Sequence, residues 1–384
     1  MDAKTIFHSG SHIAPLGLIV PEGARELGEK INNHLVSWAK NGPEEKETFI
    51  IESECPRFSS GDGKGMIKET VRGKDLYFVV DIGNYSCQYT LFDRKNSMSP
   101  DDHFMDLKRL IQATSGKAHR ISVIMPLLYG GRQHRRSYRE SLDCAVALQE
   151  LQAMGVSNII TFDAHDARVQ NAAPLMGFDN VMPTYQVMKA MFKHIPDFKP
   201  TPDSFMVISP DEGAINRNMY YASVLGVNLG MFYKRRDYSR VVNGRNPIVA
   251  HEYLGESVEG KDVFIADDII SSGESMLDVA KQLKDRGAAR VFVCTTFGLF
   301  TNGMEIFDDY YNKGYIDRLI TTNLTYLPPE TLNKPYFVVA DMSKFIALII
   351  DSMNHDISIG AVLDPTKRIH ALMEKHKKKL AEKK

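Results

Sequence analysis

Short apolar runs alternate with segments of helical spacing along almost the whole chain. Several runs are continuously apolar rather than alternating, which is typical of strands covered on both faces of a sheet. The candidate strands are 76–81, 121–125, 158–162, 205–208, 227–232, 263–267, 291–296 and 318–322. The segments of helical spacing between them are 103–114, 139–153, 186–194, 273–286 and 342–353. This order predicts an α/β protein whose sheets are mainly parallel and flanked by helices.

The length and one internal similarity bear on the number of domains. At about 100–200 residues per domain, 384 residues predict two or three domains. Helical segments end at Gly155 and at Gly287, and an apolar strand begins three residues after each glycine. Any helix–glycine–strand connection has this form, because glycine is favoured just after a helix; two domains of related fold would also produce it. We expect domains at 1–182 and 183–345, followed by a C-terminal helix and basic tail at 346–384.

Composition excludes several classes of protein. With 47 Lys and Arg against 48 Asp and Glu, the formal net charge is −1, which gives no general attraction to nucleic acid or anionic membranes. The four cysteines lie far apart, which argues against a disulfide framework and fits a reducing compartment. The N-terminus lacks the features of a signal peptide, and no apolar run approaches the ~18 residues that span a bilayer. We therefore expect a soluble, cytoplasmic protein that binds neither nucleic acid nor membrane.

The last residues differ in composition from the rest of the chain. Residues 367–384 contain eight Lys or Arg and two Glu, a formal charge of +6. Ile369, Leu372, Met373 and Leu380 have the spacing of an apolar stripe on a helix. The segment is predicted to be a terminal helix, either solvated or docked on an anion or a partner.

The strongest local signal is the stretch VFIADDIISSGES at 263–275. An apolar strand ends in Asp267 and Asp268, and a turn with hydroxyl residues and a glycine leads into a helix. Backbone N–H groups at a helix start bind anions, and glycine allows close approach of a phosphate. Burying two adjacent carboxylates at the end of a strand costs free energy unless they bind a partner. Sugar hydroxyls or hydrated Mg²⁺ would be suitable partners. The alternative is a plain strand–turn–helix with an Asp or Ser cap.

Three further segments carry charge or chemistry. YGGRQHRRSYRES at 129–141 contains four arginines, whose forked donors suit phosphate oxygens. His165 follows a candidate strand and lies between two aspartates. The Lys-Arg-Arg run at 234–236 follows strand 227–232 and opens a polar stretch of the kind that can close over a ligand. The ordinary alternatives are an exposed basic loop, a surface histidine and a solvated run of charge.

Together these segments resemble the ribose-phosphate pyrophosphokinases (phosphoribosyl pyrophosphate synthetases), which have the type I phosphoribosyltransferase fold. The 263–275 segment resembles the family's phosphoribosyl pyrophosphate loop. Further segments follow in the family's order: RFSSGD at 57–62, YGGRQHRRSYRES at 129–141, FDAHDARVQ at 162–170, SPDEGAINR at 209–217, YKRRDYSR at 233–240 and TTNLTYLPPE at 321–330. The resemblance covers roughly residues 15–350. It implies two related phosphoribosyltransferase-type domains with the active site between them.

The resemblance implies a ribose-phosphate diphosphokinase. Such an enzyme transfers pyrophosphate from Mg-ATP to the C1 hydroxyl of ribose 5-phosphate, giving phosphoribosyl pyrophosphate and AMP. Mg²⁺ is the implied cofactor, and ATP and ribose 5-phosphate are the implied partners. A homo-oligomer is also implied, because a neighbouring subunit supplies the family's adenine loop. Phosphoryl-transfer chemistry of this kind depends mostly on positioning and electrostatics.

The family's site residues map onto matching positions of this chain. For ATP binding the resemblance implies Phe58, Ser60, Asp62, Arg132 and Gln133. For ribose 5-phosphate binding it implies Asp267, Asp268, Ser271, Ser272, Gly273, Glu274 and Ser275. Lys234 and Arg236 would stabilise charge on the phosphoryl group in transit. His165 and Asp211 would contact the metal.

The chain also departs from the family pattern. Ser60 stands where an acid is usual, and Glu274 brings a negative charge near the expected phosphate. Residues 84–102 form an insertion where regulatory contacts to phosphate or ADP commonly arise, so such regulation stays open. Two rival functions remain. One is a catalytically silent regulatory subunit of a synthetase; the other is a phosphoribosyltransferase that consumes the product, with no evident use for the 129–141 loop.

Overall fold

The computed structural model describes residues 12–42, 45–236 and 248–382, leaving aside the side chains of residues 234–236 and 248–251. Contacts divide the chain into two compact units. The first unit consists of Met1–Pro183, Asn323–Tyr326 and Asp341–Asp364. The second unit consists of Thr184–Thr322, Leu327–Ala340 and Pro365–Lys384. Late segments of the chain therefore belong to both units.

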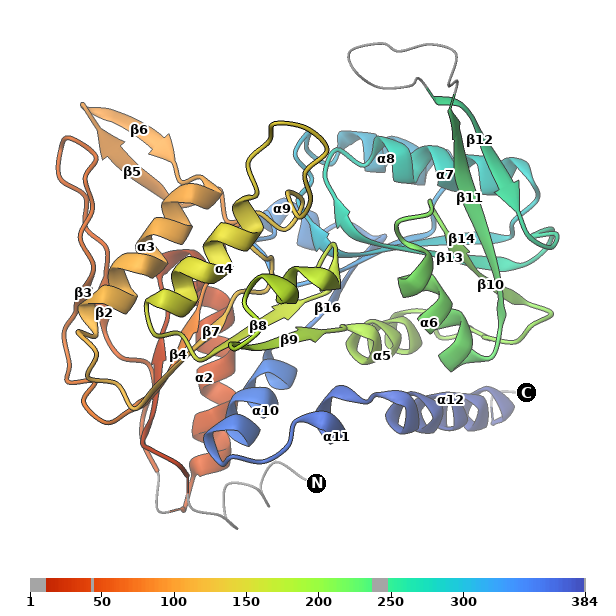
Figure 1. The fold of residues 1–384 in the computed structure, drawn as a ribbon. Helices are drawn as coiled ribbons and strands as arrows, with labels where there is room; N and C mark the ends of the chain where they lie inside the picture. The colour runs from red at the N-terminus through yellow and green to blue at the C-terminus, as the bar shows by residue number, and fades with distance from the viewer. Residues whose placement is uncertain (1–11, 43–44, 237–247, 383–384) are drawn as a thin grey trace. The chain divides into compact units, whose positions relative to one another are not determined.

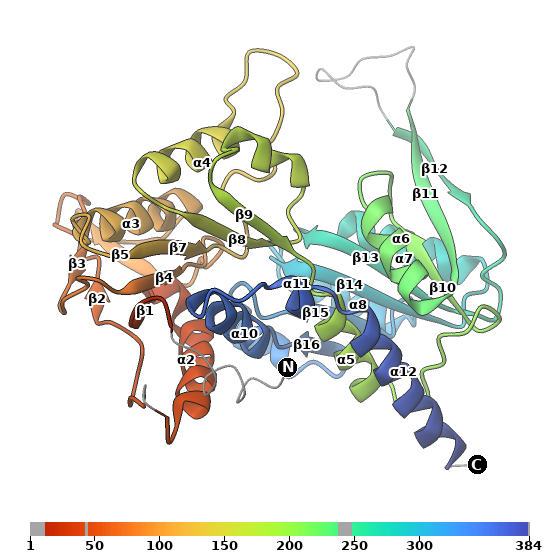
Figure 2. The same cartoon turned by 60° about the horizontal axis from the view of Figure 1, so that its bottom comes forward.

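A parallel sheet with helices on both faces forms the first unit (Figures 1 and 2). Its strands, in spatial order, are β1 (Leu16–Ile19), β4 (Asp75–Val79), β7 (Arg120–Ile124), β8 (Asn158–Phe162) and β9 (Gly177–Val181). One face is covered by α3 (Pro100–Ala113) and α4 (Asp143–Ala153), and the other by α2 (Arg25–Ala39) and α10 (Ser343–Asn354).

Smaller elements complete the first unit. Two antiparallel pairs lie outside the main sheet: β2 (Ser53–Glu54) with β3 (Met66–Ile67), and β5 (Gln88–Leu91) with β6 (Arg94–Ser97). The β5–β6 hairpin lies in the middle of the expected insertion at 84–102. Short helices are η1 (Glu22–Ala24), η2 (Ala167–Ala172) and α11 (Gly360–Leu363).

The second unit is a larger sheet that is parallel except at one edge. Its spatial order is β12 (Ile248–Leu254), β11 (Asn228–Arg236), β10 (Phe205–Ser209), β13 (Asp262–Ile270), β14 (Arg290–Gly298), β15 (Arg318–Thr322) and β16 (Phe337–Ala340). Only β12 runs antiparallel to its neighbour among these strands. The helices are α5 (Thr184–His194), α6 (Ile215–Leu225), α7 (Glu274–Asp285), α8 (Glu305–Asn312), α9 (Pro329–Leu332) and α12 (Thr366–Ala381).

The apolar strands of this sheet contribute to a core on each face. Along β10, Phe205 and Val207 pack in the cluster with α5 and α6, whereas Met206 and Ile208 pack in the cluster with α7. Successive side chains of a strand point to opposite faces, so a strand covered on both faces must be apolar throughout. The expected α/β class, with mainly parallel sheets flanked by helices, is confirmed.

The expected strands and helices are present, with some changes in their ends. Strands β11, β13 and β14 continue beyond the ends that apolar character predicts, because each pairs with a neighbouring strand over the added residues. The two similar helix–strand segments are α4 followed by β8 and α7 followed by β14. In both, the connecting glycine is left-handed, with φ of 90° at Gly155 and 87° at Gly287, which favours glycine over other residues.

The contact division differs from the expected domains in its late segments. A change of unit lies between residues 183 and 184, next to the expected boundary. Residues 346–384 do not form one separate part: Asp341–Asp364 group with the first unit and Pro365–Lys384 with the second. The basic terminal helix α12 packs on the second unit through the buried Ile369, and His376 Nε2 lies 2.8 Å from the carbonyl oxygen of Phe198. Figure 2 shows α12 alongside α5.

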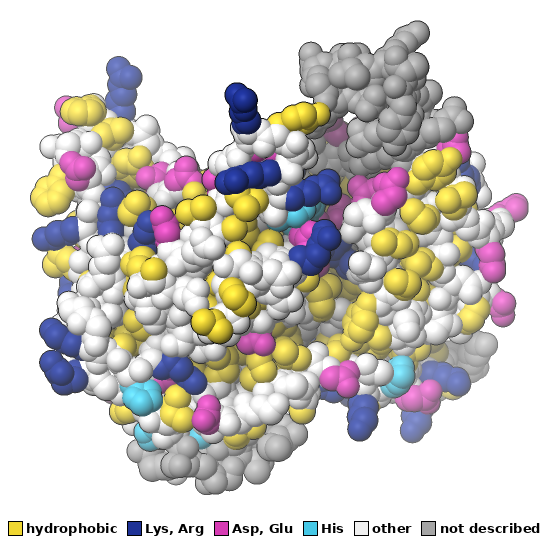
Figure 3. All heavy atoms as spheres, in the orientation of Figure 1, with side chains coloured by type: hydrophobic (Ala, Val, Ile, Leu, Met, Phe, Trp, Pro, Cys, Tyr) yellow, Lys and Arg dark blue, Asp and Glu magenta, His cyan; other side chains and the backbone are white. Residues whose placement is uncertain are grey.

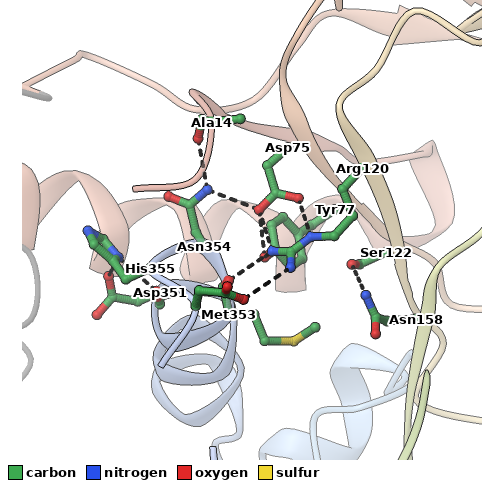
Figure 4. A network of polar contacts seen from close by, with 11 residues as sticks. Ala14, Asp75, Tyr77, Arg120, Ser122, Asn158, Asp351, Met353, Asn354 and His355 are labelled. Atoms are coloured by element: carbon green, nitrogen blue, oxygen red, sulfur yellow. Dashed lines mark hydrogen bonds and ion pairs between the residues drawn. The ribbon is translucent and has the colours of Figure 1, made fainter. Parts of the chain in front are cut away.

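A buried polar network joins α10 to the first sheet (Figure 4). Asp75 is fully buried in β4, and Arg120 of β7 donates to both of its carboxylate oxygens at 2.8 and 2.7 Å. Asn354 Nδ2 donates to the same carboxylate at 3.0 Å, and Arg120 also donates to the carbonyl of Met353 at 2.8 Å. Pairing with Asp75 and Tyr77 outweighs desolvation and raises the pKa of Arg120. The late helix is therefore fixed to the N-terminal sheet by charge-assisted hydrogen bonds.

We expect Arg120→Met to destabilise the protein by about 3–5 kcal/mol, because it leaves the Asp75 carboxylate buried without its charge partner. The free energy of unfolding is measured by urea denaturation, followed by tryptophan fluorescence and circular dichroism. The exposed Arg72 provides a matched control, and Arg72→Met is expected to change stability by less than about 0.5 kcal/mol. Equal stability of Arg120→Met and the unmodified protein would show that the network contributes nothing net.

Candidate functional site

In the second sheet, the order in which the chain adds strands reverses between β10 and β13. From β10 the chain moves to β11 and β12 on one side, and it returns to β13 on the other side. In parallel α/β sheets, ligands bind outside the carboxyl ends of the strands at such a switch point. Asp211 follows β10, whereas Asp267 and Asp268 lie near the carboxyl end of β13. Two segments that the sequence singled out therefore meet at this point.

Asp267 and Asp268 lie inside β13 rather than after its end. The strand continues to Ile270 because Ile269 and Ile270 still align with β14. Asp268 is 5% exposed, and Arg217 of α6 reaches both acids, with N–O distances of 3.4 Å to Asp267 and 3.9 Å to Asp268. Burial, and then the charge of Asp268, raise the pKa of Asp267. Two adjacent carboxylates near the end of a strand suit a bound cation or a set of hydroxyl donors.

Asn218 holds this end of β13 in place. It is fully buried on α6, where its Nδ2 donates to the carbonyl of Ala266 at 2.8 Å and its Oδ1 accepts from the N–H of Ala266 at 3.1 Å. Neither Asn218 nor Arg217 was predicted as a site residue. Arg217 is the last residue of the 209–217 segment and Asn218 follows it, which was the available signal, but helix α6 itself was not predicted.

The 271–275 loop leads from β13 into α7. Gly273 has φ of +92°, and a Cβ there would lie 2.3 Å from Cζ of Phe307, so both backbone conformation and space require glycine. Glu274 and Ser275 are the first two residues of α7, and both are exposed. Glu274 is thus in contact with water, and the free N–H groups at the helix start remain suited to an anion.

The basic loop at 129–141 precedes α4 in the first unit. Figure 3 shows several Lys and Arg side chains, with a histidine beside them, exposed around this loop. Arg132 is exposed, whereas Gln133 is half-buried and donates through Nε2 to the carbonyl of Ser141 at 2.9 Å. Gln133 therefore closes the loop, and Arg132 is available to an anionic ligand.

The structure brings the basic loop next to the segment that contains His165. The rings of His134 and His165 are 5.4 Å apart, and His134 Nε2 lies 3.5 Å from a carboxylate oxygen of Asp166. Arg168 forms hydrogen bonds with the Asp166 carboxylate, which lowers the pKa of that group far below its usual range. His165 itself is exposed. Two motifs about 30 residues apart thus form one surface, which the sequence did not predict.

The 57–62 loop connects β2 to β3. The N–H of Phe58 donates to the carbonyl of Asp62 at 2.7 Å, and that of Gly61 to the carbonyl of Phe58 at 2.8 Å. Ser60 Oγ donates to a carboxylate oxygen of Asp62 at 2.8 Å. Phe58 is 57% exposed, so it is not a core residue. Ser60, where an acid is usual, thus orients the acid two residues later.

A buried carboxylate that the sequence did not single out follows β4. Asp81 accepts hydrogen bonds from the N–H groups of Gly83 and Tyr326 at 2.8 and 2.7 Å and from Thr325 Oγ1 at 3.0 Å. Burial raises its pKa to about 6 despite these donors. Asp81 therefore fixes the short segment Asn323–Tyr326, part of the expected TTNLTYLPPE motif, to the first unit.

The remaining predicted residues are placed only in part. Lys234 and Arg236 lie within β11, which continues past the expected end at 232 because it pairs with β12; their side chains are outside the described part of the structure. The rest of the 233–240 motif, beyond Arg236, also lies outside the described residues. His165 and Asp211 belong to different units. Within residues 12–42, 45–236 and 248–382, no cluster of three or more His, Cys, Asp or Glu is placed to hold a metal.

Comparison with known proteins identifies both units. Residues 16–155 match the N-terminal domain of ribose phosphate pyrophosphokinase, and residues 184–323 match the phosphoribosyl transferase domain. The fold agrees with the crystal structure of phosphoribosylpyrophosphate synthetase from Mycobacterium smegmatis. The TM-score is 0.71 at 19% identity, covering 89% of this chain and 99% of that one. The fold is therefore that of a two-domain phosphoribosyltransferase-type protein.

Curated relatives make the assignment more specific. Ribose-phosphate pyrophosphokinase from Burkholderia pseudomallei is 30% identical over 283 residues, which cover 73% of this chain and 79% of the relative. The enzyme of the same name from Vibrio parahaemolyticus is 27% identical over 317 residues, covering 82% and 91%. The chain belongs to the ribose-phosphate pyrophosphokinase family.

We expect Asp268→Asn to lower the pKa of Asp267, because it removes the neighbouring negative charge while Arg217 remains. Carboxyl carbon NMR should show the titration midpoint of Asp267 moving to lower pH. Because the pKa of Asp267 is raised in the folded protein, its contribution to stability is complete below the ordinary pKa of aspartate. That contribution is lost as the pH rises towards the folded-state pKa. Stability should therefore fall less over that range in Asp268→Asn.

The exposed Asp278 on α7 offers a matched control. Asp278→Asn should leave both the Asp267 midpoint and the pH dependence of stability unchanged. If Asp268→Asn also left the midpoint in place, burial alone would set the pKa of Asp267, and charge coupling within the pair would be contradicted.

Proposed function

We propose that this chain transfers the diphosphoryl group of ATP to the C1 hydroxyl of ribose 5-phosphate, forming phosphoribosyl pyrophosphate and AMP. The observation that carries the proposal is that both units match the two domains of one enzyme family over 16–155 and 184–323. The relatives that align over most of both chains have the name of that activity.

Ribose 5-phosphate is proposed to bind at the end of β13. The N–H groups at the start of α7, with the hydroxyls of Ser271, Ser272 and Ser275, would hold its phosphate, and Gly273 leaves room for close approach. Asp267 and Asp268 would accept hydrogen bonds from the sugar hydroxyls. The exposure of Glu274 supports this arrangement, because its charge can stay in water.

ATP is proposed to bind to the loops of the first unit. Phe58 would stack on the adenine, and Asp62, oriented by Ser60, would accept from its amino group. Arg132 would contact the phosphates, with Gln133 holding the loop.

In this family the 57–62 loop acts across a subunit contact, so we propose a homo-oligomer with shared active sites. A location in the cytoplasm is proposed on the same family basis; none of the described helices is long and apolar enough to span a bilayer.

Mg²⁺ fits the donors that this chain offers. Magnesium is usually held by one or two carboxylates together with water and substrate phosphates rather than by a full set of protein ligands. The adjacent carboxylates of Asp267 and Asp268, of which Asp268 is buried, suit a divalent cation, and His165 and Asp211 are the family-based candidates. When bound, the ion would neutralise charge on the phosphates. Lys234 and Arg236 would stabilise the same charge during transfer.

The two rival functions are less well supported. A phosphoribosyltransferase would account for residues 184–323 but not for the match over 16–155. A silent regulatory subunit was suggested by Ser60 and Glu274. Both residues have a local explanation, because Ser60 hydrogen-bonds Asp62 and Glu274 is exposed.

Purified protein given Mg-ATP and ribose 5-phosphate should produce AMP and phosphoribosyl pyrophosphate in equal amounts, measured by anion-exchange chromatography. Omitting ribose 5-phosphate should abolish both products. A silent subunit would form neither. A phosphoribosyltransferase would instead consume added phosphoribosyl pyrophosphate when given a nucleobase.

Ser275→Ala should raise the KM for ribose 5-phosphate at least about tenfold, because a hydrogen bond to a charged phosphate is lost. The KM for ATP should stay within about twofold, as ATP is proposed to use other loops. Initial rates at varied concentrations of each substrate provide the measurement. Ser223→Ala, at an exposed position on α6, should change neither constant. Unchanged ribose 5-phosphate saturation in Ser275→Ala would remove this residue from the site.

A further inference from the structure

The inserted β5–β6 hairpin has no part in the proposed reaction, yet it lies beside the loop that connects β2 to β3 (Figure 1). We propose that the hairpin positions the 57–62 loop so that Phe58 is held ready for the adenine of ATP. Tyr89 and Leu91 are then positioning residues for nucleotide binding. The inference rests on the proposed function, and three contacts between hairpin and loop support it.

The first contact is a backbone hydrogen bond from the hairpin turn. The N–H of Phe92 donates to the carbonyl of Ser59 at 3.1 Å. Phe92 and Asp93, the two turn residues, have φ of 46° and 59°, the left-handed values of a tight two-residue hairpin. Such a turn usually contains Asn or Gly, so an exposed phenylalanine there is an unfavourable local choice. The turn joins the hairpin directly to the loop.

The second contact lies one residue earlier. Leu91 packs against Gly61, where a Cβ would come within 2.6 Å of the Leu91 Cδ1. Gly61 has φ of +94°, so the loop backbone turns sharply at the point where the leucine covers it. An apolar side chain from the insertion therefore fills the space beside the loop.

The third contact acts on the residue before Phe58. The guanidinium carbon of Arg57 lies 5.3 Å from the centre of the Tyr89 ring, a cation–π distance. On its other side, Arg57 donates to Asp106 of α3, with N–O distances of 2.7 and 2.9 Å. Arg57 is thus held between a ring from the hairpin and a carboxylate from the helix.

These contacts leave Phe58 exposed on a fixed backbone. ATP binding then costs less conformational entropy, because the 57–62 loop is already in one conformation. The far end of the insertion also touches the other ATP-side loop, because Tyr129 Oη donates to Asp101 at 2.7 Å. Just beyond the insertion, the Tyr129 ring stacks on Phe104 with ring centres 4.2 Å apart. The inserted residues therefore adjoin both segments that are proposed to bind ATP.

The test compares Tyr89→Ala and Leu91→Ala with the unmodified protein. Each should raise the KM for ATP about five- to tenfold, since the loop must then be ordered on binding. kcat and the KM for ribose 5-phosphate should stay within about twofold. Tyr89→Phe keeps the ring and should restore the KM for ATP. Thr90→Ala, exposed on the same strand, is the matched control and should have no effect.

A double-mutant cycle shows whether the hairpin acts through the loop. If Tyr89 acts through Phe58, Tyr89→Ala should add nothing to the rise in KM caused by Phe58→Ala. Independent, multiplying effects would overturn the proposal, as would an unchanged KM for ATP in both alanine variants while Phe58→Ala raises it. Absence of AMP formation in the unmodified protein would instead reject the proposed function itself.

Discussion

Covering both faces of two mainly parallel sheets is the constraint on which the other features of this protein depend. Helices pack on both sides of each sheet, so strands such as β10 and β13 are apolar over most of their length. Polar groups are then concentrated at strand ends and in the loops that follow. In the second unit, this places Asp211 and the acids of β13 at the point where the strand order reverses.

Asp75 and Asp81 are buried carboxylates in this largely apolar interior, and both are balanced by donors from distant parts of the chain. Asp75 is held by Arg120 and Asn354, and Asp81 by Thr325 and Tyr326. An unpaired charge in these positions would cost several kcal/mol. The donors explain why two late segments belong to the first unit, although most of the chain around them belongs to the second.

The departures from the family pattern also have local explanations. Ser60 replaces an acid but hydrogen-bonds Asp62, so the loop keeps a carboxylate in a defined orientation. Glu274 stands in the first turn of α7, where a negative charge is favourable, and its exposure keeps the charge in water. The 84–102 insertion, which the sequence connected only with regulation, packs against the 57–62 loop through Leu91 and Phe92.

The sequence by itself determined the α/β class, the main strands and the ordered motifs, because these depend on local periodicity and short spacings. It did not predict β1, α2 or α6, or the buried roles of Asp81 and Asn218. It also gave no sign that His134 would meet His165, or that Tyr89 would cover Arg57. Only the tertiary structure decided these contacts, because they join residues far apart in the chain whose meeting depends on sheet order and helix packing.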